Sequence, residues 1–143
     1  MGHDLTLRVR AWECGVQLPG GTPTSATVTM DLRSLEVLRG DGGIKPLSEG
    51  DRRKILEGAA KTLGDGQARF VTTRITGRWV LTGELTLHGV TRPHRVEVAV
   101  GEGRWRARTS VRQTDFGITP YSQAMGSLRV GDEVQVLVDV AQP

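Results

Sequence analysis

The stretch LTGELTLHGVTRPHRVEVAV, residues 81–100, decides the fold. Apolar residues occupy every second position in its two halves: Leu81, Leu85 and Leu87, with Gly83 in phase, and then Val96, Val98 and Val100. Such alternation predicts two strands, each with one face on a core and the other in water. The glycine and proline of HGVTRPH, residues 88–94, predict the turn between them. Together they predict an antiparallel hairpin.

The same alternation continues in both directions along the chain. On the first strand Leu5, Leu7, Val9 and Ala11 share one face, and Thr6, Arg8, Arg10 and Trp12 share the other. Further strands are indicated by Val28, Met30 and Leu32, by residues 70–75, by Trp105, Ala107, Thr109 and Val111, and by Val134, Val136, Val138 and Val140. About seven short strands predict an all-β antiparallel barrel or sandwich. We find no linker, so residues 1–143 are expected to form one domain.

One segment interrupts the alternation, KPLSEGDRRKILEGAAKTLG. Ser48 followed by Asp51 predicts a capping box, and Ile55, Leu56, Ala59 and Leu63 recur at helical spacing. Gly64 is a plausible residue just past the C-terminus of the helix. The sequence therefore predicts one short helix, from Glu49 to Leu63, that packs against one end of the sheet and could act as a lid.

Composition bounds the function without naming it. A net charge of +3 over 143 residues is ordinary for a globular domain and gives no reason to expect nucleic acid. The single Cys14 forms no internal disulfide. No stretch is long and apolar enough for a membrane span. The start, MGHDLTLRVR, has no apolar signal-peptide core, so a cytoplasmic location is the default expectation, although an upstream segment could carry an export signal.

Residues that could support catalysis or metal binding are few. His88 and His94 flank the expected turn and could face each other, but two imidazoles do not complete a zinc site. His3 and Asp4 are neighbours on a strand, so their side chains point to opposite faces. Cys14 has no base beside it in the sequence to activate its thiol. The expectation is a protein that is no enzyme and has no cofactor and no metal.

Arginines alternate with apolar residues on the strand around Trp105: Arg104, Arg106, Arg108 and Arg112, with Ser110 in phase. Nucleic-acid-binding sheets interleave aromatic residues for base stacking, whereas Trp105 points to the opposite face. The row is therefore interpreted as a solvated outer face.

The tripeptide Asp115-Phe116-Gly117 is the one that holds magnesium in protein kinases. The chain lacks the glycine-rich loop and the HRD triplet that a kinase needs, so this match is accidental.

Two motifs together give a specific resemblance. LTGELTLHGVTRPHRVEVAV resembles the signature hairpin of the YceI-like family, a lipocalin-like family of polyisoprenoid- and lipid-binding barrels. RQTDFGITPYSQAMGSLRVGDEVQVLVDV resembles the ending typical of that family, and Asp31-Leu32-Arg33-Ser34-Leu35 and GGIKPLSEGDRRKI also fit. The resemblance implies that Asp115-Phe116-Gly117 is a structural corner: Phe116 enters the core, Gly117 permits a bend, and Asp115 caps backbone amides.

The chain departs from the family in one respect. The barrel of the family has eight strands, and the one that usually precedes the segment Gly2-His3-Asp4-Leu5 has no counterpart in the given sequence: either the sequence starts too far downstream or this version lacks the strand. Two open edges would then invite association, such as a homodimer. A chain extended upstream is expected to melt at a higher temperature.

The resemblance implies a long-chain isoprenoid or lipid-like ligand inside the barrel, bound without catalysis. The expected lining residues are Leu7, Val9, Val28, Met30, Phe70, Leu85, Leu87, Val98, Trp105, Val111, Phe116 and Val136. For each of them, simple core packing is the alternative role. The alternative function is a structural or protein-interaction module whose barrel is packed solid.

Overall fold

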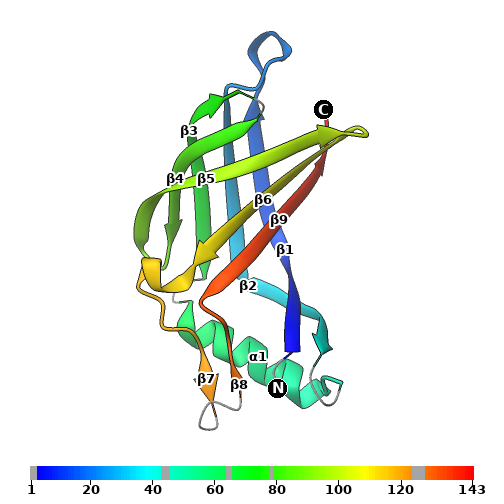
Figure 1. Ribbon diagram of the computed structural model, residues 1–143, viewed down its shortest axis with the longest axis vertical. Coiled ribbons are helices and arrows are strands. Elements are labelled where there is room, and N and C mark those ends of the chain that lie inside the picture. Colours follow the sequence, from blue (N-terminus) through cyan, green and yellow to red (C-terminus); the bar gives the residue numbers. More distant parts are fainter. Residues whose placement is uncertain (1–2, 43–45, 64–65, 78, 124–127) are drawn as a thin grey trace.

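The computed structural model describes residues 3–42, 46–63, 66–77, 79–123 and 128–143 (Figure 1). The predicted all-β architecture is confirmed: within these residues seven long antiparallel strands form one curled sheet, a half-barrel (Figure 1). The strands of this sheet are β1 (His3–Gln17), β2 (Ser25–Gly42), β3 (Gln67–Thr76), β4 (Val80–Leu87), β5 (Val90–Gly101), β6 (Arg104–Arg112) and β9 (Glu133–Ala141). The remaining elements are α1 (Glu49–Thr62), the 3-10 turns η1 (Pro19–Gly21) and η2 (Gln113–Phe116), and the short strands β7 (Ser122–Gln123) and β8 (Leu128–Arg129), which pair with each other.

The strand order in the sheet is β1-β2-β3-β4-β5-β6-β9. Each strand lies beside its neighbour in sequence until β9, which pairs with β6. Within the described part of the chain β1 and β9 are the two edges of this sheet, so the wall stays open between them. Edge strands present unpaired backbone groups, and association through them, including a homodimer, stays a prediction.

One face of the sheet, here called the inner face, lies on the concave side of the curl (Figure 1). The strand registers align its side chains in rows, one of which runs Cys14, Val28, Phe70 and Leu85 across β1 to β4. Another row places Val98, Ala107 and Val138 side by side on β5, β6 and β9. The alternation predicted for β2, β4, β5, β6 and β9 therefore places these residues on the correct face.

The alternation predicted for β1 is wrong beyond Val9. Between Val9 and Ala11 the register with β2 shifts, from Val9 opposite Leu35 to Ala11 opposite Asp31. The extra residues on β2 form a bulge, which turns the following residues of β1 to the other face. Trp12, expected on the outer face, consequently lies opposite Met30 on the inner face.

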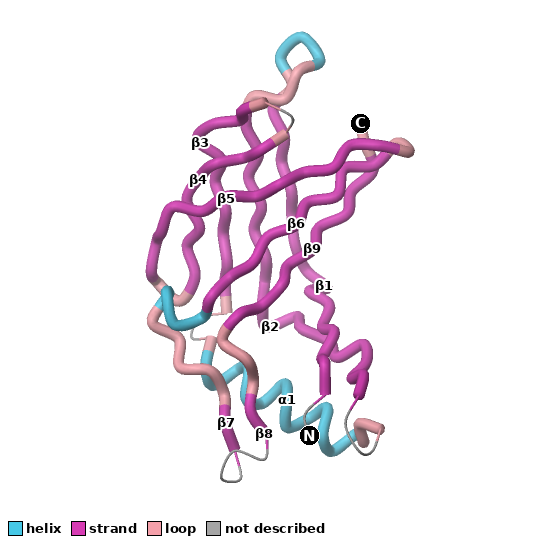
Figure 2. Tube along the Cα trace, viewed as in Figure 1, coloured by secondary structure: helices cyan, strands magenta, loops and turns pink. Residues whose placement is uncertain are grey.

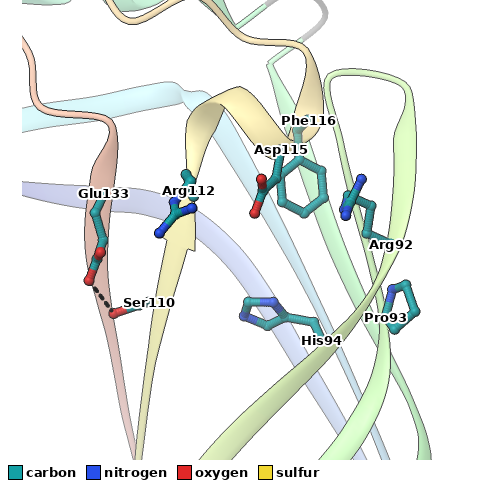
Figure 3. A pocket seen from close by; sticks show the side chains of 8 residues that line it. All are labelled: Arg92, Pro93, His94, Ser110, Arg112, Asp115, Phe116 and Glu133. Carbon is teal, nitrogen blue, oxygen red and sulfur yellow. Dashed lines mark hydrogen bonds between the residues drawn. The ribbon is translucent and has the colours of Figure 1, made fainter.

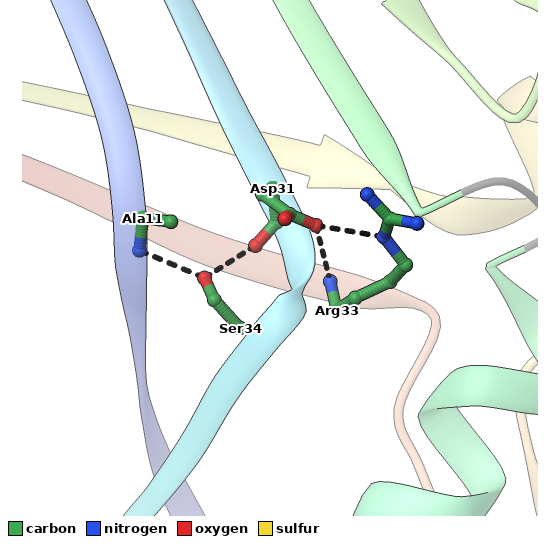
Figure 4. A network of polar contacts seen from close by, with 4 residues as sticks. All are labelled: Ala11, Asp31, Arg33 and Ser34. Carbon is green, nitrogen blue, oxygen red and sulfur yellow. Dashed lines mark hydrogen bonds and ion pairs between the residues drawn. The ribbon is translucent and has the colours of Figure 1, made fainter.

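Side chains satisfy the backbone groups that this bulge leaves without ladder partners (Figure 4). The amide of Ala11 donates to Ser34 Oγ at 2.8 Å, and that hydroxyl donates to the carbonyl of Asp31. The Asp31 carboxylate accepts from the Arg33 amide and guanidinium, at 3.0 and 3.1 Å. These hydrogen bonds lower the pKa of Asp31. The run Asp31 to Ser34 is thus the feature that breaks the alternation.

Figure 2 shows α1 at one end of the sheet, and the buried core, to which Phe116 of η2 belongs, lies at this end. It comprises Leu85, Leu87, Val111, Phe116 and Ile118, with Leu63 of the helix end packed against it. The predicted capping box is confirmed, since Ser48 Oγ accepts from the Asp51 amide and Asp51 accepts from the Ser48 amide, both at 3.0 Å. The helix ends one residue earlier than predicted, at Thr62, and Gly64 lies outside the described residues.

The turn between β4 and β5 is shorter than predicted. It contains only His88 and Gly89, with φ of 57° and 73°, and the strand resumes at Val90. Positive φ at both positions gives a two-residue turn that matches the twist of a hairpin. Residues 90–94, expected in the turn, are instead paired with β4, with His94 opposite Gly83. His88 and His94 therefore do not face each other.

Candidate functional site

Apolar side chains cover the inner face, and many of them are only half-buried. Val28, Met30, Phe70, Val98, Trp105 and Val136, all predicted to line a ligand site, belong to this half-buried set. Val100 and Val134, which the prediction omitted, remain 44% and 39% exposed on the same face, and Trp12 is 37% exposed. A contiguous apolar surface that keeps this much contact with water is typical of a binding surface.

The other predicted lining residues lie elsewhere. Leu85, Leu87, Val111 and Phe116 are buried in the core, where they pack against other side chains of the protein. Leu7 and Val9 pair with Val37 and Leu35, on the part of the β1–β2 hairpin beyond the bulge, where β2 no longer pairs with β3. The half-buried surface is therefore confined to the part of the sheet between the bulge and the turns at the opposite end.

The wall of the half-barrel opens between β5 and β6. Their pairing extends from Gly101 opposite Arg104 only to Glu97 opposite Arg108. Pro93 lies in the half of β5 that pairs with β4 but not with β6. A proline, which lacks an N–H, suits a strand that has no partner on one side. We call this opening the β5–β6 window.

A cavity of about 360 Å³ occupies the window. Figure 3 shows Arg92 and Pro93 on the β5 side, Arg112 and Ser110 on the β6 side, and Asp115 of η2 between them. Phe116, His94 and Glu133 complete the lining. With two arginines and two carboxylates the rim is polar and close to neutral, so it has no strong preference for an anion or a cation. The sequence signal that could have revealed this window is Pro93 within an alternating strand.

His94 closes the window on its paired side. Its Nε2 lies 2.7 Å from Thr109 Oγ1, and that hydroxyl donates to the carbonyl of Arg95 at 2.9 Å. Because the hydroxyl proton is already used, Nε2 carries a proton and donates it to Thr109. The imidazole ring also meets the ring of Phe70 edge-on, with centroids 6.4 Å apart. Burial lowers the pKa of His94, which favours this neutral form.

The two sequence motifs that carried the family resemblance meet at the core end of the window. His88, in the β4–β5 turn, lies with Nδ1 3.3 Å from the carbonyl of Phe116, to which it donates. Phe116 is 3% exposed, and Gly117 ends η2 with φ of 70°. The predicted corner is therefore confirmed for these two residues.

The predicted cap by Asp115 is wrong. In the described residues no amide donates to its carboxylate; Asp132 instead accepts from the amide and hydroxyl of Thr114, at 2.8 and 2.6 Å. These bonds, led by the hydroxyl, lower the pKa of Asp132. Asp132 belongs to the VGDEV segment, so the ending motif ties the start of β9 to the corner.

The described residues contain no cluster of three or more histidine, cysteine, aspartate or glutamate side chains that could hold a metal ion. Cys14 lies in the inner-face row near the open edge, and burial raises the pKa of its thiol. A raised pKa disfavours the reactive thiolate. None of the described helices has the length and hydropathy that a membrane crossing demands.

The arginine row lies on the outer face of β6. Arg104 and Arg106 both pair with Asp139 of β9, and Arg106 also approaches Glu102 at 3.7 Å. These guanidinium groups lower the pKa of Asp139, chiefly through the hydrogen bond from Arg104. Arg108 and Arg112 are exposed.

Comparison with known proteins places the chain among proteins of this architecture. Residues 4–142 match the YceI-like domain. The chain belongs to the YceI-like family.

Solved structures support the fold independently of sequence. The chain is similar to BcnA of Burkholderia cenocepacia, with 21% identity, a TM-score of 0.60, and coverage of 93% of this chain and 84% of that one. It is also similar to a YceI protein of Campylobacter jejuni, with 13% identity, a TM-score of 0.62, and coverage of 96% and 83%. Among curated proteins no sequence matches this YceI-like chain.

Proposed function

We propose that this YceI-like protein binds an apolar amphiphile, such as a polyisoprenoid or another long-chain lipid, on its inner face, and carries or sequesters it without catalysis. The observation that supports the proposal is the half-buried apolar surface formed by Met30, Phe70, Val98 and Trp105 with their neighbours. Membership of a family of lipid-binding barrels agrees with it.

Burial of apolar area is sufficient to drive such binding. Each methylene group that leaves water contributes about 0.8 kcal/mol, and the half-exposed side chains of the inner face gain further when a ligand covers them. Long chains fit this mechanism because they offer many such groups. The mechanism requires no general base or nucleophile, so the proposed role is binding and transport.

Native mass spectrometry of the gently purified protein, followed by titration with a fluorescent prenyl probe, tests the proposal. We expect a co-purifying lipid or uptake of the probe, and quenching or enhancement of the fluorescence of Trp12 and Trp105, which lie on the inner face. A protein that carries no lipid and takes up no prenyl probe would refute the proposal.

Two neighbouring residues of β5 give a matched pair of variants. Val98 is half-buried on the inner face, whereas Ala99 is exposed on the outer face opposite Arg106. Val98→Glu places a charge on the apolar surface and is expected to weaken probe binding about tenfold or more, because an apolar ligand offers the carboxylate no partner. Ala99→Glu is expected to leave binding unchanged. Equal effects of the two variants would contradict an inner-face site.

Within the described residues β1 and β9 are the unpaired edges of the sheet, which favours a second candidate, a protein-interaction module. An edge strand can pair with a strand of a partner through main-chain hydrogen bonds. Failure of lipid uptake combined with concentration-dependent association in sedimentation experiments would favour this function over lipid binding.

A further inference from the structure

Thr72 of β3 is a buried polar residue on a largely apolar surface. Its side chain is buried, with the residue 7% exposed, and within the described residues its Oγ1 has no hydrogen-bond partner. It lies two residues after Phe70, in phase with that inner-face side chain. A buried hydroxyl without a partner costs free energy, and native proteins contain few of them. Its presence on the proposed binding face therefore suggests that its partner is the ligand.

The local backbone holds Thr72 at this position. Thr72 lies opposite Gly83, next to a register shift between Thr72 and Arg74 that marks a bulge in β3. The backbone of β3 approaches Gly83 so closely that a Cβ there would lie 2.2 Å from the carbonyl oxygen of Val71. Because Gly83 has no side chain, none stands between Thr72 and His94, which lies opposite Gly83 on the other side.

The row through Thr72 differs from its neighbours in polarity. It continues through Gly83 and His94, and His94 is hydrogen-bonded to Thr109 of β6. The hydroxyl of Thr109 and Nε2 of His94 are already engaged, whereas Thr72 Oγ1 can both donate and accept. The row itself contains no lysine or arginine; Arg92 and Arg112 lie with His94 at the rim of the β5–β6 window, so an anion at Thr72 would have no cation within the row.

We propose that Thr72 hydrogen-bonds the neutral oxygen-bearing group, an alcohol or a ketone, of an otherwise apolar ligand whose chain lies along the inner face. The inference rests on the proposed function and adds to it the chemical class of the head group. A hydroxyl paired in this way makes the site prefer a prenyl alcohol to the corresponding hydrocarbon and to the corresponding diphosphate.

The experiment compares the affinities of three probes, geranylgeraniol, the corresponding prenyl hydrocarbon and geranylgeranyl diphosphate, by displacement of a fluorescent prenyl probe. The wild-type protein is expected to bind the alcohol most tightly. Thr72→Val keeps the shape of the side chain but removes its hydroxyl, and is expected to weaken alcohol binding about threefold to tenfold while hydrocarbon binding stays unchanged. Thr72→Ser, which keeps the hydroxyl, is expected to retain the preference.

Thr91→Val is the matched control, because Thr91 is exposed and its hydroxyl bonds that of Thr86. If Thr72→Val does not fold, Thr72→Ala removes the same hydroxyl and is read in the same way. Tighter binding of the diphosphate, or equal losses of alcohol and hydrocarbon, would overturn the inference. If the probes bind but Thr72→Val does not change the affinity for the alcohol, this inference alone is refuted. If no probe binds, the proposed function is refuted as well.

Discussion

Gly83 shows how a single missing side chain shapes the sheet. The bulge in β3 brings the Val71 carbonyl and the Thr72 backbone over Gly83, at distances of 2.2 and 2.9 Å from where a Cβ would lie. Real Cβ contacts do not come this close, so any other residue would push the two strands apart. The glycine of the family hairpin is thus explained by packing rather than by a turn.

Gly83→Ala is expected to destabilise the protein by about 1–3 kcal/mol, because the backbone of β3 must shift to admit the methyl group. The measurement is the urea midpoint of unfolding. Gly15→Ala, at a position with nothing within 4 Å of the added Cβ, serves as the control and should be neutral or slightly stabilising. Similar midpoints for Gly83→Ala and wild type would contradict the close approach.

His94 links stability to pH. Burial lowers its pKa, so the unfolded state binds a proton more readily than the folded state. The contribution of neutral His94 to the free energy of unfolding is therefore fully present above its pKa in the unfolded state, about 6.5. It declines as the pH falls toward the pKa in the folded state. The carboxylates with lowered pKa values, including Asp132 and Asp139, lose their contribution only in more acidic solution, below about pH 4.

The free energy of unfolding should consequently fall between about pH 7.5 and pH 5, and His94→Gln should show a smaller fall, since its amide is not protonated in this range. Urea titrations at the two pH values measure the difference. His88→Gln serves as a comparison at a histidine outside the inner-face row. An unchanged pH dependence in His94→Gln would exclude His94 as its source.

At the scale of elements, α1 depends on a close contact that helix propensity alone would discourage. Gly58 is buried, and a Cβ there would lie 2.6 Å from the ring of Tyr121. A glycine within a helix costs about 1 kcal/mol relative to alanine, so its presence is explained by the ring packed against it. The helix is thus fixed to the core end by the segment that follows η2.

The effect of Gly58→Ala on the free energy of unfolding should change sign when the Tyr121 ring is removed. In the wild type it is expected to destabilise by about 1–2 kcal/mol, because the methyl group displaces the Tyr121 ring. In a Tyr121→Ala background the same change should stabilise by about 0.5–1 kcal/mol, since only the helix propensity remains. Thermal and urea unfolding of the four proteins of this double-mutant cycle provide the measurement. If Gly58→Ala stabilised the protein with Tyr121 in place, the close contact between Gly58 and the Tyr121 ring would be contradicted.

The elements also show which parts of the fold a sequence can predict. Alternation correctly located seven strands, because each covers a core with one face, and Ser48 with Asp51 correctly located the helix start. Alternation failed at Trp12, because the bulge depends on pairing with Asp31 to Ser34 of another strand. It also failed for residues 90–94, where Pro93 lies in a part of β5 that pairs with β4 but not with β6.

At the scale of the whole molecule, the candidate site was predicted only in part. The alternation of apolar residues along each strand was sufficient to place residues such as Met30, Phe70 and Val98 on the inner face. The alternation of a strand does not distinguish a packed side chain from a half-buried one, so the sequence could not separate the buried Leu85 and Phe116 from the half-buried side chains. The position of Thr72 depends on a bulge in β3, and the β5–β6 window depends on the divergence of two strands. Neither feature leaves a periodic pattern in the sequence.

The short ladder of hydrogen bonds between β2 and β3 has a consequence for local unfolding. β1 and β2 pair along nearly their whole length, whereas the ladder between β2 and β3, as far as the structure describes the chain, covers only residues 27–31 and 67–71. The β1–β2 hairpin can therefore separate from the rest as one cooperative unit. Native-state hydrogen exchange should show the amides within this hairpin sharing one opening free energy, lower than that of β4 to β6. A single opening free energy for the entire sheet would show instead that the hairpin and the remaining strands unfold only together.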